Sequence, residues 1–158
     1  MLVILHSGQT GVERGAHSAA IASGLSIAGF MPLDKRDEIG PVPPDVAEHL
    51  TPCFDRGPRP AVKANVGIAS GILLLVPDAE RAESFTAMAA VVQAARSARV
   101  PLLTADSSTN VAAVSDWTKQ LRETSGSTRI LVTGPRATRW REGESIARRM
   151  VSALAMGL

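Results

Sequence analysis

Short runs of consecutive apolar residues alternate along the chain with longer segments in which apolar residues recur every three or four positions. The short runs predict buried strands, and they are Leu2–Leu5, Leu25–Phe30, Ile72–Val76, Leu102–Leu103 with Val100, and Ile130–Val132. The longer segments predict helices, namely Val12–Ser23, Ala61–Ala69, Glu83–Ala98, Val111–Glu123 and Glu144–Met156. This alternation indicates an α/β fold: a three-layer, doubly wound parallel sheet of about five or more strands with helices on both faces.

The segment Pro32–Pro60 interrupts this alternation. It holds seven of the ten prolines and has no sustained hydrophobic period, so we expect a long ordered loop or lid there rather than a helix or strand. Loops of that length inside a compact domain are usually functional or disordered. The length of 158 residues predicts a single domain spanning residues 1–158. Gly24, just after the first predicted helix, is placed to adopt a positive φ.

Composition excludes several classes of protein. One cysteine excludes a disulfide scaffold, and three dispersed histidines give no zinc spacing. The aromatic content of 3% leaves too few rings for a base-stacking platform. Because no apolar run approaches the roughly 18 residues that span a bilayer, and the first residues lack a signal peptide's charged start, we expect a cytoplasmic protein without a membrane anchor.

The segment after the first predicted strand carries the first candidate for chemistry. Gly8 and Gly11 permit a tight turn and leave backbone N–H groups at a helix N-terminus, an arrangement that binds anions. The side chains of Gln9 and Thr10 add donors. No lysine follows the second glycine, so the loop is not a P-loop. We predict a phosphate cradle here; the alternative is a tight turn in which Thr10 only caps the helix.

Two further loops are expected at the same edge of the sheet. After the last strand, Gly134 begins a rigid turn that projects Arg136, whose guanidinium suits phosphate or carboxylate. After the third strand, Ser84 and Thr86 lie near a predicted helix start. They are expected either to bind ligand or, in the case of Ser84, only to cap the helix.

The formal net charge of +2 is unevenly distributed. The range from Arg129 to Arg149 holds six arginines and two glutamates, a local charge of +4, which leaves −2 for the remaining chain. A compact cationic patch beside a glycine loop predicts a small anionic ligand and argues against a nucleic-acid surface. We expect Arg139 and Arg141 to be solvated. Trp140 is expected to pack against its own helix or a subunit neighbour, the alternative being that it stacks on a ligand ring.

The segment Ser7–Arg14 resembles the S-G-G-Q-T-G-V-D-R opening of the "putative molybdenum carrier" family, which is related to the lysine-decarboxylase-like phosphoribohydrolases in the nucleotide-binding SLOG group. Further matches follow in order: Pro32, Arg36, Glu38, Gly40, Pro41 and Pro43, then Asn65-Val66, Ser84 and Thr86, and Gly134-Pro135-Arg136. The chain departs from the family pattern at His6 and Ser7 (Ser-Gly in the family), Glu13 (Asp), Gly71 (Asp) and Leu131 (Asn).

This resemblance implies a Rossmann-like fold and a protein that stores or delivers the molybdenum cofactor (molybdopterin) or binds a nucleotide. Together with the loops above, it gives ten expected ligand-binding residues: Gly8, Gln9, Thr10, Gly11, Arg14, Arg36, Ser84, Thr86, Gly134 and Arg136. No residue is assigned a catalytic or metal-binding role.

An enzyme is the less favoured class. The related phosphoribohydrolases carry P-G-G-x-G-T-x-x-E, whereas Pro77 is followed here by Asp-Ala-Glu-Arg, and Met88 or Ala89 stands near the position of the glutamate. Neither side chain can act in acid–base catalysis. Two alternatives to a carrier stay open: an N-glycosidase acting on a nucleotide derivative, with one of three carboxyl groups as its acid (Glu13, Glu38 or Asp78), and a nucleotide sensor.

The remaining reactive side chains are expected to be structural. His6 and His17 are interpreted as packed histidines, and Cys53 as a buried, inert thiol. The charge run Lys35–Glu38 is either a solvated face or part of a lid. The alanine-rich helix around Val91–Ala95 can pack closely against a symmetry mate, so we expect a homo-oligomer, either a dimer or a tetramer.

Overall fold

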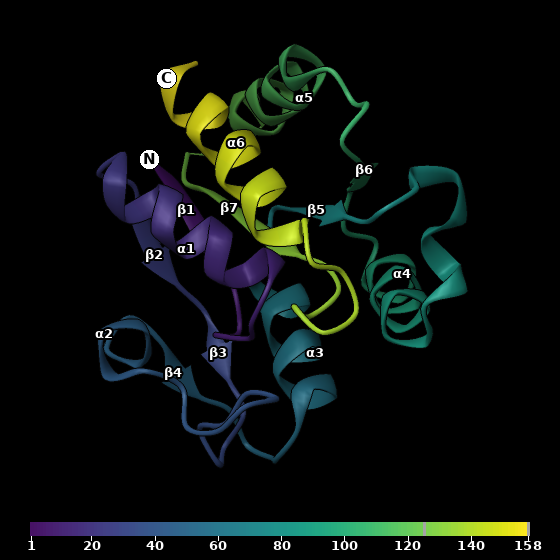
Figure 1. Ribbon diagram of the computed structural model, residues 1–158. Helices are drawn as coiled ribbons and strands as arrows, with labels where there is room; N and C mark the ends of the chain where they lie inside the picture. Colours follow the sequence, from purple (N-terminus) through teal and green to yellow (C-terminus); the bar gives the residue numbers. More distant parts are fainter. Residues whose placement is uncertain (125, 158) are drawn as a thin grey trace.

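Figure 1 presents a computed structural model of the protein, in which residues 1–124 and 126–157 are described. The main sheet has five parallel strands in the order β2-β1-β7-β5-β6. Their bounds are β1 Leu2–Leu5, β2 Ser26–Ala28, β5 Gly71–Leu75, β6 Leu102–Ala105 and β7 Thr128–Thr133. The last strand lies in the middle of the sheet between β1 and β5, and the predicted doubly wound α/β fold is confirmed.

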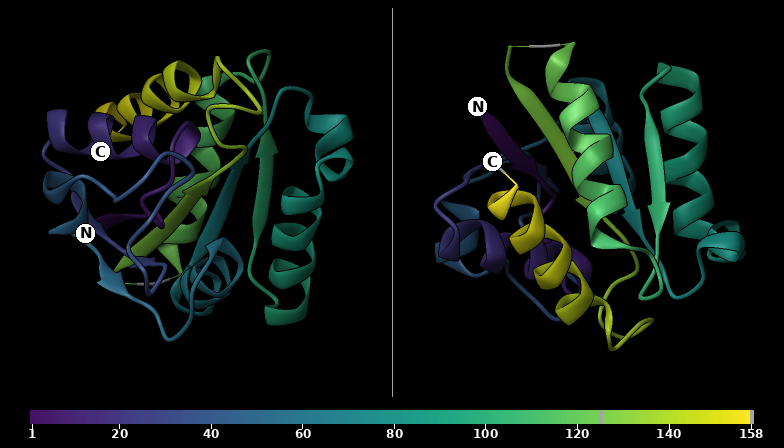
Figure 2. Two further views of the ribbon diagram at one scale, coloured as in Figure 1. Left: turned by 60° about the horizontal axis from the view of Figure 1, so that its bottom comes forward. Right: turned by 90° about the horizontal axis from the view of Figure 1, so that it is seen from above.

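Helices cover both faces of this sheet (Figure 2). One face packs against α1 (Val12–Ala22), α5 (Val111–Glu123) and α6 (Gly143–Met156), and the other packs against α3 (Pro58–Ile68) and α4 (Thr86–Ala98). Successive side chains of a strand point to opposite faces. In β5, accordingly, Leu73 and Leu75 enter the first core while Ile72 and Leu74 enter the second.

The strand expected at Leu25–Phe30 is in fact two strands. Between β2 and β3 (Phe30–Met31), Gly29 has a φ of 133°, and a Cβ there would lie 2.2 Å from the carbonyl oxygen of His6. The chain therefore leaves the main sheet at Gly29. It then pairs in parallel with β4 (Thr51–Pro52) to form a second, two-stranded sheet.

The proline-rich segment, residues 32–60, contains more regular structure than the sequence predicts. It includes the short helix α2 (Pro44–Ala47), the strand β4 and the first turn of α3. Helix α3 begins at Pro58 rather than at Ala61, because a proline in the first turn lacks only an N–H that has no partner inside the helix. A small apolar cluster holds this segment together and consists of Met31, Val42, Val46 and Leu50.

The helix expected at Glu83–Ala98 is broken near its start. A 3-10 helix, η1, spans Ala79–Ser84, and α4 begins at Thr86 after Phe85, whose backbone is extended. The carboxylate of Asp78 accepts the N–H of Glu80 at 3.0 Å and so begins η1 early. At the end of α1, Gly24 has the expected positive φ, at 69°. Within the described ranges, no helix is long and apolar enough to cross a membrane.

The closest helix packing is between α1 and α6. A Cβ at Gly15 would lie 2.2 Å from the carbonyl oxygen of Glu144, so the two backbones touch at this point. Trp140 is buried beside this contact, in the core shared by α1 and α6, so it packs within its own chain rather than stacking on a ligand.

Replacing Gly15 by alanine should force α1 and α6 apart and lower the free energy of unfolding by about 1–3 kcal/mol. Gly67→Ala is the matched control, because Gly67 lies in α3 with nothing within 4 Å of the added Cβ. The control should be neutral or more stable by up to about 1 kcal/mol. Urea unfolding of both variants measures the difference, and equal stabilities would contradict this account of the packing.

Candidate functional site

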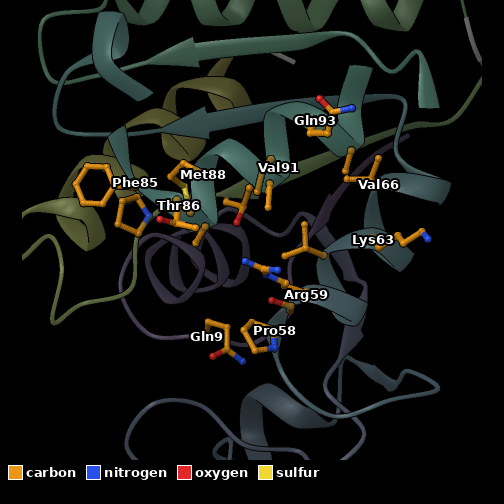
Figure 3. A pocket seen from close by; sticks show the side chains of 18 of the residues that line it. Gln9, Pro58, Arg59, Lys63, Val66, Phe85, Thr86, Met88, Val91 and Gln93 are labelled. Carbon is orange, nitrogen blue, oxygen red and sulfur yellow. The ribbon is translucent and has the colours of Figure 1, made fainter. Parts of the chain in front are cut away.

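The carboxyl ends of β1, β7 and β5 meet at one edge of the sheet, where parallel α/β proteins bind their ligands. A groove of about 1030 Å³ begins at this edge and continues between α3 and α4 (Figure 3). Residues after β1 and at the end of β7 line the groove at this edge, namely Ser7, Gln9, Thr133, Gly134 and Arg136, together with Glu13 of α1.

The two helices give the groove walls of different character. On α3, Arg59 and Lys63 lie beside Val62 and Val66, because residues three and four apart share one helix face. Facing them, α4 contributes a largely apolar wall of Met88, Val91 and small residues, of which Ala87, Ala90, Ala94 and Ala98 are spaced at helical intervals. Figure 3 shows Arg59 and Lys63 on one side of the groove and α4 side chains on the other.

Glu13 ties the β1–α1 loop to β7. Its Oε1 atom accepts the N–H of Ser7 at 2.5 Å and the Ser7 hydroxyl at 2.6 Å, and its Oε2 atom accepts the Thr133 hydroxyl at 3.0 Å. Burial raises the pKa of Glu13, although these hydrogen bonds act in the opposite direction. A backbone donor next to the loop that was expected to cradle a phosphate is therefore engaged by a carboxyl group of the protein itself.

The carboxyl group of Glu38 joins the β1–α1 loop to the loop that follows β7. Glu38, from the proline-rich segment, accepts the Thr10 hydroxyl and both the N–H (3.3 Å) and the hydroxyl (2.5 Å) of Thr138, and it pairs with Arg136 Nε at 3.2 Å. Burial opposes its ionisation, but the hydrogen bonds from Thr10 and Thr138 and the Arg136 guanidinium together lower the pKa of Glu38. Glu38 thus occupies the position that an oxyanion would take between these loops.

Arg14 is also engaged within the protein. It donates to the carbonyl oxygen of Gly8 from Nε at 3.1 Å and Nη2 at 2.9 Å, and it forms an ion pair with Asp37. The side chain of Arg36 is exposed, while its carbonyl oxygen accepts the amide of Gln9 at 3.1 Å. Both arginines therefore fix the proline-rich segment to the glycine loop.

The structure divides the ten expected binding residues into two groups. Five of them line the groove: Gln9, Ser84, Thr86, Gly134 and Arg136. The other five do not: Gly8, Thr10, Gly11, Arg14 and Arg36. Three of this second group (Thr10, Gly11 and Arg14) line a smaller hollow of about 420 Å³ instead.

Neither proposed helix cap is present. The N-cap of α1 is Gly11, that of α4 is Phe85, and neither makes a side-chain capping bond. Thr10 donates to Glu38 and accepts the N–H of Ala137. The hydroxyl of Ser84 donates to the carbonyl oxygen of Arg81 at 2.7 Å, so it ends η1 rather than beginning α4.

Three cations at the groove were not among the expected binding residues. Arg59, Lys63 and Arg139 line it and, in the described part of the chain, belong to no ion pair. Arg139 is exposed, as expected for a solvated arginine, and it also lines the groove. The signal for the other two was the spacing of Arg59, Val62, Lys63 and Val66, which places two cations on the apolar face of a helix.

A buried pair of histidines, His6 and His17, lies next to the glycine loop, and His6 contacts it directly. The N–H of Gly8 donates to His6 Nδ1 at 2.9 Å, so the Nε2 atom of His6 carries the proton and donates to His17 Nδ1 at 3.0 Å. Burial, and then the nearby His17, lower the pKa of His6 to about 3. Burial and His49 likewise lower the pKa of His17. The interpretation of His6 as a packed histidine is confirmed.

The cysteine of the chain lies away from the groove. Cys53 is buried and its thiol donates to the carbonyl oxygen of Asp55 at 3.2 Å, as expected for an inert thiol. Over residues 1–124 and 126–157, no three His, Cys, Asp or Glu side chains are grouped so that they could hold a metal ion.

Most of the chain matches the sequence model of a known protein family. A sequence model of the circularly permutated YpsA SLOG family matches residues 4–155. The chain belongs to this family. The relationship to the SLOG group that was inferred from the glycine loop is thereby confirmed. A comparison with curated proteins gave no match.

A solved structure shares the fold of this family member. It is the crystal structure of a "putative molybdenum carrier protein" from Syntrophus aciditrophicus, which is 20% identical in sequence. The alignment covers 96% of this chain and 93% of that chain, with a TM-score of 0.82. At this identity the likeness establishes the Rossmann-like α/β fold.

The histidine pair predicts how stability depends on pH. The folded protein keeps His6 and His17 neutral, whereas the unfolded chain protonates both below about pH 6.5. Unfolding then takes up protons, so the free energy of unfolding should fall as the pH is lowered from about 6.5, by up to about 1.4 kcal/mol per pH unit for each histidine. The raised pKa of Glu13 has the opposite effect, because the folded protein then binds a proton that the unfolded chain releases. This is one group, whereas two histidines lower the stability.

Urea unfolding at pH 8, 6 and 5 measures this dependence. The variant His17→Gln removes one of the two groups and should flatten the slope. A wild-type stability that stays constant or rises between pH 7 and pH 5 would contradict the assignment of two neutral, buried histidines.

Proposed function

We propose that the protein binds a small anionic ligand with a planar ring system in the groove between α3 and α4. The observation that carries this proposal is the combination of apolar walls with cations (Arg59, Lys63 and Arg139) that belong to no ion pair in the described chain. The groove volume of about 1030 Å³ is at the upper end of the range for small-molecule sites, roughly 300–1,000 Å³. The cations suit an oxyanion and the apolar walls suit a ring.

The family and the structural neighbour support a carrier or binding role. The neighbour is named as a molybdenum carrier, and the phosphorylated pterin of the molybdenum cofactor has an oxyanion and a planar ring, as does a nucleotide. The groove residues fit those two parts. They include no thiol or imidazole, and Cys53 is not among them. Residues of this chain would therefore hold the organic part of that cofactor rather than its metal.

The proposal includes self-association in the cytoplasm. Helix α4 combines small residues with partly exposed valine at Val92, so a second copy could approach closely. Analytical ultracentrifugation distinguishes a monomer from the dimer or tetramer that we expect.

An N-glycosidase is the second candidate, and Glu13 is the observation in its favour. Of the three carboxyl groups considered, Asp78 begins η1 and Glu38 joins two loops, whereas Glu13 lines the groove with a raised pKa, as a general acid requires. In this reaction Glu13 would protonate the departing base, water would add to the sugar carbon, and the water proton would restore Glu13. Release of free base from a nucleoside monophosphate, lost in Glu13→Gln, would establish this activity.

The direct test is the identity of the bound ligand. Native mass spectrometry of protein purified under mild conditions should detect a bound phosphorylated pterin or nucleotide. A nucleotide without pterin would exclude the molybdenum carrier but leave the binding site in place. A ligand that is neither anionic nor planar would contradict the proposal.

Arg59→Ala should weaken the binding of nucleoside monophosphates by about 1.5–3 kcal/mol, the usual contribution of a hydrogen bond to a charged group. Arg56→Ala is the matched control, since Arg56 is an exposed arginine just before α3 that does not line the groove. Isothermal titration calorimetry on both variants measures the difference. If the two variants bind equally well, Arg59 does not contact the ligand.

A further inference from the structure

The inner end of the groove is a floor made of three oxygen-bearing side chains. Ser7 follows β1, Thr133 ends β7, and Glu13 lies in the first turn of α1. All three line the groove, and each is 4% exposed or less. A ligand that fills the groove down to the sheet edge meets these oxygens with little water present.

The hydroxyl protons of this floor are already used. Ser7 donates its proton to Glu13 Oε1 at 2.6 Å, and Thr133 donates its proton to Glu13 Oε2 at 3.0 Å. A hydroxyl that has donated its proton can still accept through its lone pairs, and an ionised carboxylate only accepts. Toward a ligand, the floor therefore presents acceptors and negative charge.

Positive charge lies elsewhere, nearer the opening. Arg59 and Lys63 stand on α3, and Arg136 and Arg139 follow β7. A phosphate at the floor would be repelled by Glu13 in a site of low dielectric, whereas at the opening it would meet guanidinium and ammonium groups. The ligand is thus oriented with its oxyanion toward the opening and its hydrogen-bond donors toward the floor.

We infer that the floor of Ser7, Glu13 and Thr133 selects a heterocycle with two adjacent N–H donors, namely the 2-aminopyrimidin-4-one edge shared by guanine and pterins. This inference rests on the proposed function and names the ligand class of the same groove. The ring N–H and the exocyclic amino group of such an edge both point toward acceptors. Adenine instead offers a ring nitrogen lone pair beside its amino group, and that lone pair would face the oxygens of the floor.

The state of Glu13 agrees with this selection. Burial raises its pKa, although Ser7 and Thr133 already donate to its two oxygens. Two N–H donors from a ligand would favour the ionised form, which is the form that accepts them. The preference therefore arises from the acceptors of the floor rather than from the cations at the opening.

The first experiment compares four probes on the wild-type protein by calorimetry: guanosine, inosine and adenosine 5′-monophosphates, and neopterin monophosphate. Inosine differs from guanosine only by the missing amino group. We expect the guanosine or the neopterin compound to bind about tenfold or more tightly than the inosine and adenosine compounds. The tighter of the two identifies a nucleotide or a pterin as the source of this edge.

The second experiment tests the residue. Glu13→Gln should reduce the preference for guanosine over adenosine monophosphate to less than about threefold, because an amide can donate as well as accept. Glu123→Gln, an exposed glutamate at the end of α5, removes the same charge and should leave the preference unchanged. Equal affinity of the wild type for guanosine and adenosine compounds would overturn the inference alone. Failure of all four probes to bind would overturn both it and the proposed function.

Discussion

Hydrogen bonds from loop donors to the protein's own carboxylates determine the shape of the sheet edge at which the candidate site lies. Parallel strands end with their loops at one edge of the sheet, and helix N-termini there leave backbone donors without partners. Among the loop donors there, Glu13 accepts the N–H of Ser7 and Glu38 accepts the N–H of Thr138, while Asp37 forms an ion pair with Arg14. Each carboxyl group joins segments far apart in sequence, so removing one would leave buried donors unpaired.

Because of this internal pairing, the candidate site lies on a different side of the glycine loop from the one that the sequence predicts. With the glycine loop and Arg14 engaged within the protein, the space between this loop and the proline-rich segment is the smaller hollow of about 420 Å³. The open space lies on the other side of the loop, where α3 and α4 diverge from the sheet edge. The groove is polar and acidic at the floor, cationic at the opening and apolar between, and this order of chemistry constrains how any ligand can enter. The arginines and the carboxyl group of Glu13 thus lie at different depths of the same groove.

The hydrophobic pattern predicted the fold class and most elements, because a buried strand and an amphipathic helix each have their own period. Helix α5 has the expected bounds, and α1 and α6 differ from them by one residue. What the pattern missed depends on contacts from elsewhere in the chain. The break at Gly29 exists because the His6 carbonyl group leaves no room for a Cβ, and the place of β7 between β1 and β5 follows from packing that no local period records.

The site was harder to predict than the fold for a physical reason. A sequence shows which residues can donate to an anion, but not whether an anion of the same chain reaches them first. Glu38 is 28 residues from Thr10 and 100 from Thr138, so its pairing with both is invisible until the chain is folded. The sequence did not predict Arg59 and Lys63 as binding residues, because the groove that they line forms only when α3 and α4 pack in the folded protein. A search of the sequence for donors therefore finds the right edge of the sheet, while the pairing of charges inside the fold decides on which side of the glycine loop a ligand can bind.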